Sequence, residues 1–422
     1  MKSIVWMKDD LRLHDSPAVC AALRNGAASI TVVRTAESRL SHVRPTARRL
    51  AHEAEAIESM RNVLERSGSR LVTIGAEADD LLQTCSAFGA STIHANTQVG
   101  DALGHARDRV VVRKARTAGV RYVEHAADGV QRGSRTEAAA CVTSAKDLAG
   151  LRFGRVPAAL VRLRDYLARL PNANYRRDMW LPGPDASASS RLSVDLACGT
   201  LSGDRVLRET EDEANRRDPW THRAYQEFAN RIHWRRQFVQ MLEKNVDAFP
   251  WGPTRAESVQ DAERLQAWRR GETGYPLVDA AMRDLHATGW INFRLRQTAC
   301  SFAIDLLGLD LHRVGVALGE MFDDYCPGIH WSQIALQSGM VPGRGPRIVN
   351  PVKQARELDP QGRYVKRLLP HLRDEPLERL FDPYRNSLLG GWPVIIDHEQ
   401  AAKRARARYP GKRDEGQANL PL

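Results

Sequence analysis

A serine-rich stretch, residues 187–193, holds the first side chains whose types and spacing suggest chemistry. Ser189, Ser190 and Ser193 supply three hydroxyl groups within five residues, where a helical stretch begins that ends near Ser202. Backbone N–H groups at the start of a helix have no partner within the helix, so together with nearby hydroxyl groups they can bind a phosphate. Serines at such a position more often simply cap the helix. The spacing therefore leaves a phosphate site and a plain cap both open.

Tryptophan and arginine lie side by side in a second stretch, Ile232–Arg236, which we expect to be helical. Trp234 could offer a flat surface for a stacked base, and Arg235 a fork of N–H donors for a phosphate. A helix that buries its tryptophan and exposes its arginines would have the same sequence. The stretch is compatible with nucleotide binding without requiring it.

The third stretch, Gly271–Arg296, combines helix signals with two closely spaced arginines. Pro276 suits the first turn of a helix, and Thr288-Gly289 suits a break between two helices. Arg294 and Arg296 are two residues apart, so they point to different sides of a helix. One of them could face a carboxylate or a cofactor while the other meets solvent. The carboxylates that the sequence offers are Asp323 and Asp324.

Short apolar runs rich in β-branched residues recur through the first third of the chain, at residues 3–6, 30–33, 71–74, 92–94 and 120–123. Leu50, Ile57, Met60 and Leu64 predict the inner face of a helix after the second run. Strands alternating with helices predict an α/β domain with a Rossmann-like parallel sheet, whose ligands would lie beyond the carboxyl ends of its strands. The sequence lacks GxGxxG after the first run and lacks GxxxxGK[ST] altogether, which argues against a conventional dinucleotide site or a P-loop.

The composition changes beyond residue 125. Small residues and prolines dominate the next sixty positions or so, and helical periodicity follows. A chain of 422 residues favours at least two domains. We therefore expect an α/β domain over 1–125, a linker over 126–185 and an all-helical domain over 186–422.

Charge and cysteine content narrow the class of protein. Lysine and arginine number 62 against 51 aspartates and glutamates, a formal charge of +11 that is compatible with a polyanionic partner. No stretch approaches the length of a membrane span, and charged residues follow the short apolar start, which argues against a signal peptide. The six cysteines lack paired spacing, so we expect reduced thiols in a cytoplasmic protein without a metal site.

Several stretches, taken in order along the chain, resemble the photolyase/cryptochrome family. They are Trp6–Asp15, Ser189–Ser193 with Leu196, Gly199 and Ser202 behind it, Gly271–Arg283, Thr288–Arg296 and Arg347–Pro351. The resemblance covers nearly the whole chain. It implies an N-terminal α/β antenna domain followed by an all-helical domain that holds a U-shaped FAD.

The resemblance also implies roles for individual residues. Trp234 would stack against a DNA lesion, and Arg296 would pair with Asp323 or Asp324 beside the flavin ring. Tyr175 would pack on the adenosine side of FAD. The residues implied at the pyrophosphate are Ser189, Ser190, Arg191, Leu192 and Ser193, with Arg235 reaching the same phosphates.

The implied reaction is light-driven repair of pyrimidine dimers in UV-damaged DNA. In this family an excited, reduced flavin donates an electron to a lesion that has been flipped out of the duplex. A second, antenna chromophore is possible, with folate, deazaflavin and flavin all open. We expect the protein to act as a monomer.

The chain departs from the family at the expected lesion pocket. Arg231 stands where photolyases for cyclobutane dimers usually have Glu, and Phe293 and Gln297 replace an Asn and a Met. The segment Asp324–Trp331 has no counterpart of the Asn near the flavin edge. A cryptochrome-type photoreceptor with little repair activity is therefore the alternative. A third possibility, outside the family, is a nucleotide-binding α/β protein with a helical appendage.

The relay of three tryptophans that usually reduces the flavin also looks interrupted. Its inner position aligns with Ser332 and its middle position with Leu311, and no tryptophan stands at the outer one. Trp331 lies beside the inner position. The sequence thus predicts a substitute path from Trp331 through Trp290 or Trp268, or reduction from solution.

Overall fold

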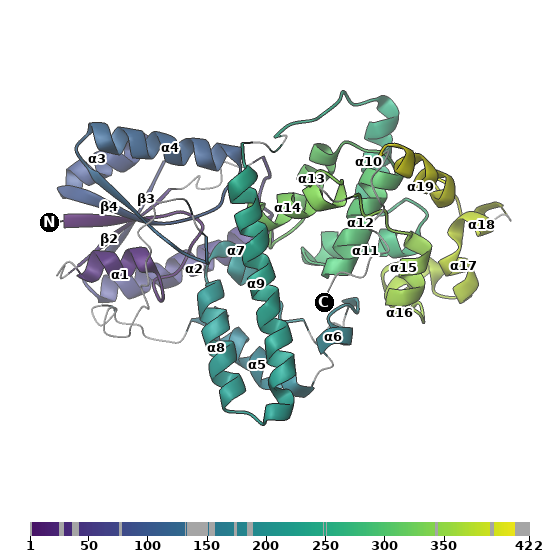
Figure 1. Ribbon diagram of the computed structural model, residues 1–422, viewed down its shortest axis with the longest axis horizontal. Coiled ribbons are helices and arrows are strands. Elements are labelled where there is room, and N and C mark those ends of the chain that lie inside the picture. Colours follow the sequence, from purple (N-terminus) through teal and green to yellow (C-terminus); the bar gives the residue numbers. More distant parts are fainter. Residues whose placement is uncertain are drawn as a thin grey trace. The chain divides into compact units, whose positions relative to one another are not determined.

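The computed structural model of the chain (Figure 1) describes most of its length. The described residues are 2–24, 29–35, 42–75, 78–130, 132, 151, 157–172, 175–183, 189–247, 249, 251–341, 345–388 and 392–409. Residues 187 and 188 of the serine-rich stretch and much of the expected linker (133–150 and 152–156) therefore lie outside the described residues.

A five-stranded parallel sheet forms the first part of the chain. Its strands are β1 (Lys2–Met7), β2 (Thr31–Thr35), β3 (Arg70–Ile74), β4 (Ala90–Asn96) and β5 (Arg121–His125). They pair in the order β3-β2-β1-β4-β5, and every pair is parallel. This confirms the predicted α/β domain, because each strand overlaps one of the five apolar runs.

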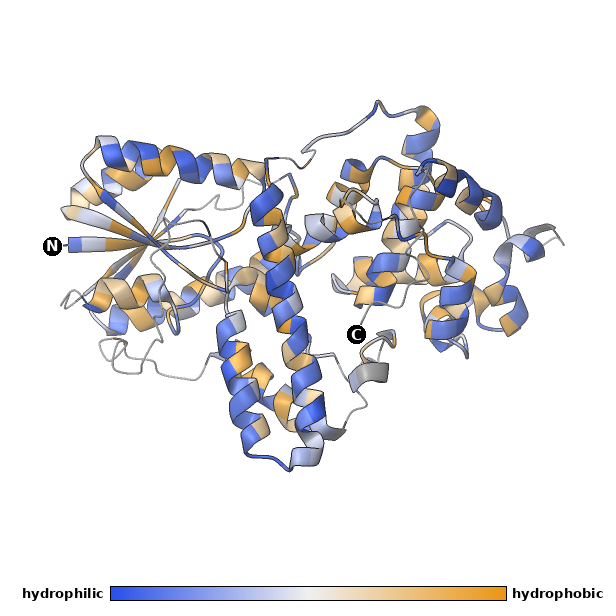
Figure 2. Ribbon diagram, in the orientation of Figure 1, coloured by the Kyte–Doolittle hydropathy of each residue, from blue (hydrophilic) through white to orange (hydrophobic). Residues whose placement is uncertain are grey.

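Helices cover both faces of the sheet (Figure 1). They are α1 (Pro17–Arg24), α2 (Ala47–Arg66), α3 (Ala78–Phe88) and α4 (Ala102–Thr117). Alternate residues of β1 enter two separate cores. Val5 and Met7 pack with α1 and α2, and Ile4 and Trp6 pack with α3 and α4. The alternation follows from the two-residue period of a strand, and Figure 2 shows the apolar residues concentrated along these strands.

The inner face of α2 differs from the predicted one. Met60 and Leu64 are buried as expected, but Leu50 is 50% exposed. Arg49 and Glu53 are buried in its place, at 5% and 3% exposure. They form an ion pair with Nε of Arg49 3.0 Å from Oε1 of Glu53. The sequence prediction considered only apolar residues, so it could not identify a helix face on which a pair of charged residues is buried.

The remainder of the described chain is helical, as predicted. Its α-helices are α5 (Ala158–Arg169), α6 (Tyr175–Asp178), α7 (Ser193–Cys198), α8 (Gly203–Asn215), α9 (His222–Asn245), α10 (Val259–Arg270), α11 (Pro276–Thr288), α12 (Phe293–Ser301), α13 (Leu311–Gly319), α14 (Pro327–Gln337), α15 (Pro351–Leu358), α16 (Arg363–Leu368), α17 (Leu377–Phe381), α18 (Pro383–Leu388) and α19 (His398–Ala407). Short 3-10 turns lie at Leu170–Asn172, Pro219–Thr221 and Pro370–Leu372, and a π-helical turn at Phe302–Leu306 follows α12. Pro276 opens α11 and Gly289 ends it with φ +68°, as the sequence predicts. Among the described helices, none has the length and apolar character needed to cross a membrane.

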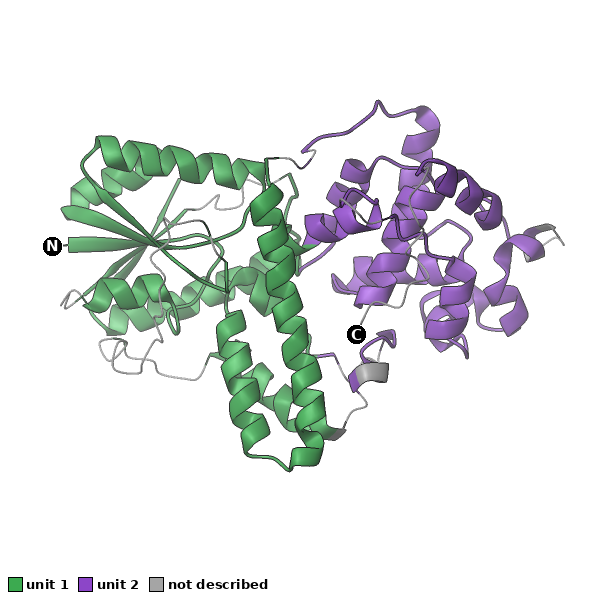
Figure 3. Ribbon diagram, viewed as in Figure 1, with its two compact units in different colours: residues 1–172, 190–248, 324–329 green, residues 173–189, 249–323, 330–422 purple. Residues whose placement is uncertain are grey.

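The chain divides into two compact units (Figure 3). Unit 1 comprises Met1–Asn172, Ser190–Ala248 and Asp324–Ile329, and unit 2 comprises Ala173–Ser189, Phe249–Asp323 and His330–Leu422. Unit 1 thus adds α5, α7, α8 and α9 to the α/β domain. The division into 1–125, 126–185 and 186–422 stays a prediction. No disulfide links the cysteines among the described residues.

Two histidines near the carboxyl ends of the strands predict a loss of stability at mildly acidic pH. His125 ends β5, with its Nε2 3.0 Å from Nδ1 of His94, and His14 follows β1. Burial lowers the pKa of His125 and that of His14 from the ordinary 6.5 to about 4. Both imidazole rings are therefore protonated more readily in the unfolded chain than in the folded one. The stability that the neutral rings contribute is therefore complete above a pH of about 6.5 and is lost as the pH falls towards 4.

We expect the free energy of unfolding in urea to fall by about 1–2 kcal/mol for each histidine between about pH 7 and about pH 5. Asp279 acts in the opposite direction, because burial raises its pKa to about 6. The histidine effect is therefore measured as a difference between variants. His125→Gln should flatten the pH profile, and the exposed His371→Gln should leave it unchanged. A His125→Gln profile parallel to that of the wild type would contradict the prediction.

Candidate functional site

The serine-rich stretch leads into α7 without capping it. The helix begins at Ser193 with Leu192 at the N-cap, and the side chain of Leu192 offers no capping hydrogen bond. Ser190 Oγ instead accepts from Leu192 N at 3.4 Å. Arg191, between them, is exposed and has a left-handed backbone with φ +56°. The plain-cap interpretation therefore does not describe α7, and its first amides and neighbouring hydroxyl groups suit an anionic ligand.

The other end of α7 is held by groups from elsewhere in unit 1. The last carbonyls of a helix have no partner within the helix. Here four successive carbonyls each accept a hydrogen bond: Leu196 O from Arg235 Nη2 (2.9 Å), Ala197 O from Arg49 Nη2 (3.4 Å), Cys198 O from Leu11 N (3.1 Å) and Gly199 O from Arg12 Nη1 (3.2 Å). Three of the four donors are guanidinium groups, which also interact favourably with the negative end of the helix dipole.

The turn after α7 packs closely against the loop that follows β1. Gly199 has φ +68°, and a Cβ at this position would overlap the backbone of Asp9 and Asp10. Ser202, expected near the end of the first helix, instead caps α8 through a hydrogen bond from Arg205 N. Its Oγ also donates to the Asp15 carboxylate. Asp9, Asp10 and Asp15, within the motif Trp6–Asp15, thus contact the turn that follows α7.

Left-handed backbone conformations gather around the same turn. Asp15 (φ +49°), Asp128 (φ +52°) and Arg191 are the non-glycine residues with positive φ in the described chain. Asp15 accepts from Arg12 Nε at 3.0 Å, and Asp128 accepts from Gly203 N at 2.7 Å. Burial opposes the charge on Arg12, but Asp15 and Asp128 raise its pKa above the ordinary value. Such strained residues persist where surrounding contacts fix them, and they gather at ligand clamps.

Helix α9 carries a partly buried tryptophan and two arginines near it in the sequence. The guanidinium carbon of Arg231 lies 4.4 Å from the ring centroid of Trp234, one turn along the helix. Ile232 is buried, whereas Trp234, Arg231 and Arg235 are each partly buried. Arg235 donates to Leu196 O, and its Nη2 lies 3.8 Å from Cys326 Sγ. Arg231, Trp234 and Arg235 therefore share one side of α9.

Arg294 and Arg296 diverge in unit 2, as their spacing predicts. The guanidinium carbon of Arg294 lies 4.9 Å from the Trp180 ring, and that of Arg296 lies 4.1 Å from the Phe322 ring. Arg296 Nε also donates to the carbonyl of Ile291 at 2.8 Å. The two arginines thus reach different surroundings from the same helix, α12.

The two candidate carboxylates for Arg296 belong to different compact units. Asp323 lies in unit 2, where its N–H donates to Gly289 O at 3.0 Å. Its carboxylate packs so tightly on Gly289 that a Cβ there would overlap it. Asp324 begins the segment Asp324–Ile329 of unit 1. Both are buried, at 7% and 8% exposure. Asp323 and Arg296 both contact the short loop that joins α11 to α12.

Two further predicted residues are buried in unit 2. Tyr175 opens α6 and is 7% exposed. Trp331, in α14, is fully buried, with its ring stacked on His312 at a centroid distance of 5.5 Å and an interplanar angle of 15°. The centroid of the Trp251 ring lies 5.6 Å from that of Trp331. Sequence alignment missed Trp251, because no family motif passes through it.

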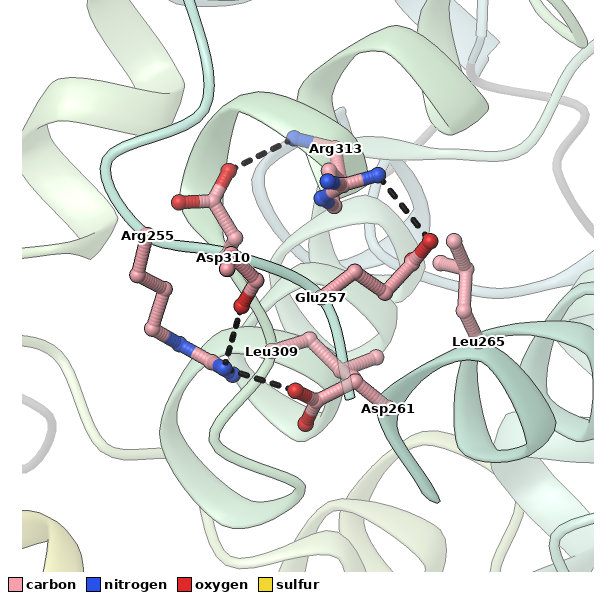
Figure 4. Close-up of a pocket in the computed structure, with 8 residues that line it drawn as sticks. Arg255, Glu257, Asp261, Leu265, Leu309, Asp310 and Arg313 are labelled. Atoms are coloured by element: carbon pink, nitrogen blue, oxygen red, sulfur yellow. Dashed lines mark hydrogen bonds and ion pairs between the residues drawn. The ribbon is translucent and has the colours of Figure 1, made fainter. Parts of the chain in front are cut away.

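A small cavity in unit 2 is distinct from the predicted site (Figure 4). It is lined by Arg255, Ala256, Glu257, Asp261, Leu265, Leu309, Asp310 and Arg313. Its volume of about 10 Å³ suits a single water molecule. Arg255 pairs with Asp261 at 2.6 Å and Arg313 with Glu257 at 3.1 Å. These ion pairs join the segment before α10 to the start of α13 and leave no room for a cofactor.

Two family models match the chain. Residues 3–134 match the DNA photolyase model, and residues 220–411 match the model of the FAD binding domain of DNA photolyase. The chain is 30% identical over 441 residues to a deoxyribodipyrimidine photo-lyase of Thermus thermophilus, an alignment that covers 95% of this chain and 96% of the relative.

Solved structures share the fold. A cryptochrome of Synechocystis superposes with a TM-score of 0.77 at 22% identity, covering 96% of this chain and 98% of that one. A bacterial class III photolyase from Agrobacterium tumefaciens superposes with a TM-score of 0.76 at 24% identity, covering 97% of each chain. At these identities the likeness establishes the two-part architecture and nothing finer.

Proposed function

Since the chain belongs to the photolyase/cryptochrome family and carries its FAD-binding domain, we propose that it is a blue-light-driven photolyase that repairs pyrimidine dimers in UV-damaged DNA. The observation that carries this proposal is the partly buried Trp234 on α9, with the guanidinium of Arg231 over its ring. An indole beside guanidinium groups suits a flipped-out base and its phosphate. We further propose that it acts as a monomer in the cytoplasm.

The residues present fit FAD in the chemistry of their donors. The serine segment and the uncapped first turn of α7 offer hydroxyl and amide donors to a pyrophosphate. Ser189, Ser190, Arg191, Leu192 and Ser193 are the residues that we assign to it. Tyr175 would pack on the adenosine side, and Arg296 with Asp323 or Asp324 would flank the flavin ring. Arg235 donates to the far end of α7, so it supports the phosphate segment through the helix.

When bound and reduced, FAD supplies the photoexcited electron, and the chain supplies position and charge. Trp234 would hold the lesion by stacking. Arg231 places a cation where related photolyases carry a carboxylate. A guanidinium donates hydrogen bonds and accepts none. Arg231 would therefore donate to the carbonyl oxygens of a damaged base and could not accept a hydrogen bond from the N–H groups of that base.

The same substitution supports the alternative, a cryptochrome-type photoreceptor with little repair activity. A Glu at this position accepts a hydrogen bond from the N3–H of a damaged base, and an arginine cannot make that hydrogen bond because it has no acceptor. The two functions differ in one measurable outcome. The purified protein should have the absorption spectrum of a bound flavin, and the reduced protein should restore dimer-containing DNA under blue light. A flavoprotein that binds FAD but repairs neither cyclobutane dimers nor (6-4) products would favour the photoreceptor.

Trp234→Ala is expected to weaken binding of damaged DNA by about ten- to a hundred-fold. Base–aromatic stacking contributes about 1–3 kcal/mol per base, which sets this range. FAD content and thermal stability should stay close to those of the wild type, because Trp234 is only partly buried and Ile232 provides the fully buried contact. Trp234→Phe keeps a ring and should lose less affinity. Filter-binding or fluorescence anisotropy with damaged and undamaged duplexes measures the difference. Loss of FAD from Trp234→Ala would instead assign the ring to the fold.

A further inference from the structure

Helix α2 of the α/β domain buries a charged pair where the sequence predicts an apolar face. Arg49 is 5% exposed and Glu53 is 3% exposed, whereas Leu50 between them is half in solvent. A buried ion pair is weak evidence for stability, since apolar residues of similar volume often serve as well. Its presence at this point in α2 therefore calls for a role other than stability.

The guanidinium of Arg49 joins two distant segments of unit 1. Its Nη2 donates to Ala197 O at the end of α7, at 3.4 Å, and its Nη1 donates to Tyr325 O. Ala197 lies in the last turn of α7, the helix that follows the proposed pyrophosphate segment. Tyr325 directly follows Asp324, one of the two carboxylates proposed beside the flavin. One side chain thus fixes the spacing between two segments assigned to the cofactor.

Glu53 fixes the direction in which Arg49 points. Its Oε1 accepts from Arg49 Nε at 3.0 Å and lies 3.6 Å from Cys198 Sγ, the last residue of α7. Its Oε2 lies 3.5 Å from Arg34 Nη2, at the end of β2. The Glu53 carboxylate is therefore held by groups from the sheet and from α7. Because it binds Nε of Arg49, the two terminal nitrogens of Arg49 are directed to the carbonyl oxygens of Ala197 and Tyr325.

Arg235 makes the same connection from α9. It donates to Leu196 O, one residue before Ala197, and approaches Cys326 Sγ, one residue after Tyr325. Two arginines from separate helices thus tie together the same two segments. A lysine could not reproduce this connection, because a single ammonium lacks the forked geometry.

We propose that Arg49, oriented by Glu53, is a positioning residue of the flavin site, which fixes the α7 segment relative to the segment of Asp324. The assignment of those two segments to FAD rests on the proposed function. Through this contact the α/β domain acts on cofactor binding without touching the cofactor.

The test replaces the pair by apolar residues of similar volume in the double variant Arg49→Met/Glu53→Leu. Removing both charges together avoids leaving one of them buried alone, so the fold should be retained. We expect the Kd for FAD to rise about ten-fold or more, as removal of supporting partners commonly does at bound groups. Kd and the FAD dissociation rate are read from flavin fluorescence, and the unfolding midpoint of the apoprotein is measured beside them. A Kd within two-fold of the wild type, at any stability, overturns the proposal.

Two further variants keep the test decisive. Lys8→Met removes a buried cation of the same domain. Lys8 Nζ lies 2.7 Å from Oδ2 of Asp108, which belongs to α4. Lys8→Met should lower stability and leave the Kd for FAD unchanged. If it weakens FAD as much as the double variant does, Arg49 has only a structural role. Arg49→Lys keeps the charge beside Glu53 and should still weaken FAD, even if the double variant fails to fold; a wild-type Kd would overturn the proposal.

Ser190→Ala/Ser193→Ala separates this proposal from the one on which it rests. If the serine variant binds FAD normally, the assignment of the pyrophosphate segment is wrong. If the serine variant loses FAD and the Arg49 variants do not, the segment is assigned correctly and the positioning role is wrong.

Discussion

Arg296→Leu is expected to lower the affinity for FAD by about a hundred- to a thousand-fold. In the proposed site Arg296 is the cation that pairs with Asp323 or Asp324, and breaking a buried pair commonly costs about 3–5 kcal/mol. It also removes the hydrogen bond from Nε to Ile291 O and the stacking on Phe322. The purified variant should therefore be nearly colourless and should take up added FAD only at high concentration.

Arg294→Leu is the matched control for this prediction. The residue lies two positions earlier on the same helix and has the same side chain, but its guanidinium stacks on Trp180 and its Nη1 donates to Gln297. We expect it to retain FAD at the wild-type level. Titration of the apoproteins with FAD, followed by flavin fluorescence, compares the two. Equal loss in both variants would mean that α12 responds to any lost arginine and that Arg296 has no specific role at the flavin.

The alternating pattern was sufficient to predict the α/β domain. A parallel sheet buried on both faces needs continuous apolar strands, and each of the five runs became a strand. Turn signals were equally informative, because Gly289 ends α11 in the left-handed conformation that glycine adopts at least cost. Periodicity and turn chemistry are local properties, so one sequence is enough to read them.

The contacts that position the candidate site are not local, and here sequence reasoning was incomplete. Arg49 appears in the sequence as a solvent-facing residue of a charged helix, yet its partners are a carbonyl 148 positions away and another 276 positions away. The serine motif indicated where a phosphate could bind, but nothing in it indicated that Arg12, Arg49 and Arg235 would hold the opposite end of α7. Such groups come together only after the chain has folded.

The aromatic cluster around Trp331 is a second set of contacts that the sequence did not predict. The sequence suggested Trp290 or Trp268 as the next ring, whereas the structure places Trp251 against Trp331, together with Phe249. Trp268 is itself fully buried, with its Nε1 donating to Ala299 O at 3.1 Å. Trp251 is only partly buried. Trp331 and Trp251 therefore form a pair of oxidisable rings in which one member is buried and the other reaches solvent.

Trp331→Phe is expected to remove the fast phase of light-driven flavin reduction. Phenylalanine fills most of the same space beside His312 and Gly315, but its ring is far harder to oxidise than an indole. Trp251→Phe should preserve the first oxidation, that of Trp331. It should shorten the lifetime of the charge-separated state, because the oxidised Trp331 can no longer take an electron from a ring that an external reductant reaches.

Trp268→Phe is the matched control, since it removes a buried indole of the same unit that the sequence suggests as one alternative next ring. Transient absorption after blue light on the oxidised protein, with a reductant present, measures all three variants. Repair by protein reduced chemically beforehand should be the same in each, because that electron passes to the lesion without these rings. If Trp331→Phe is reduced at the wild-type rate while Trp268→Phe is slow, the path runs through Trp268, and the contact between Trp331 and Trp251 serves only packing.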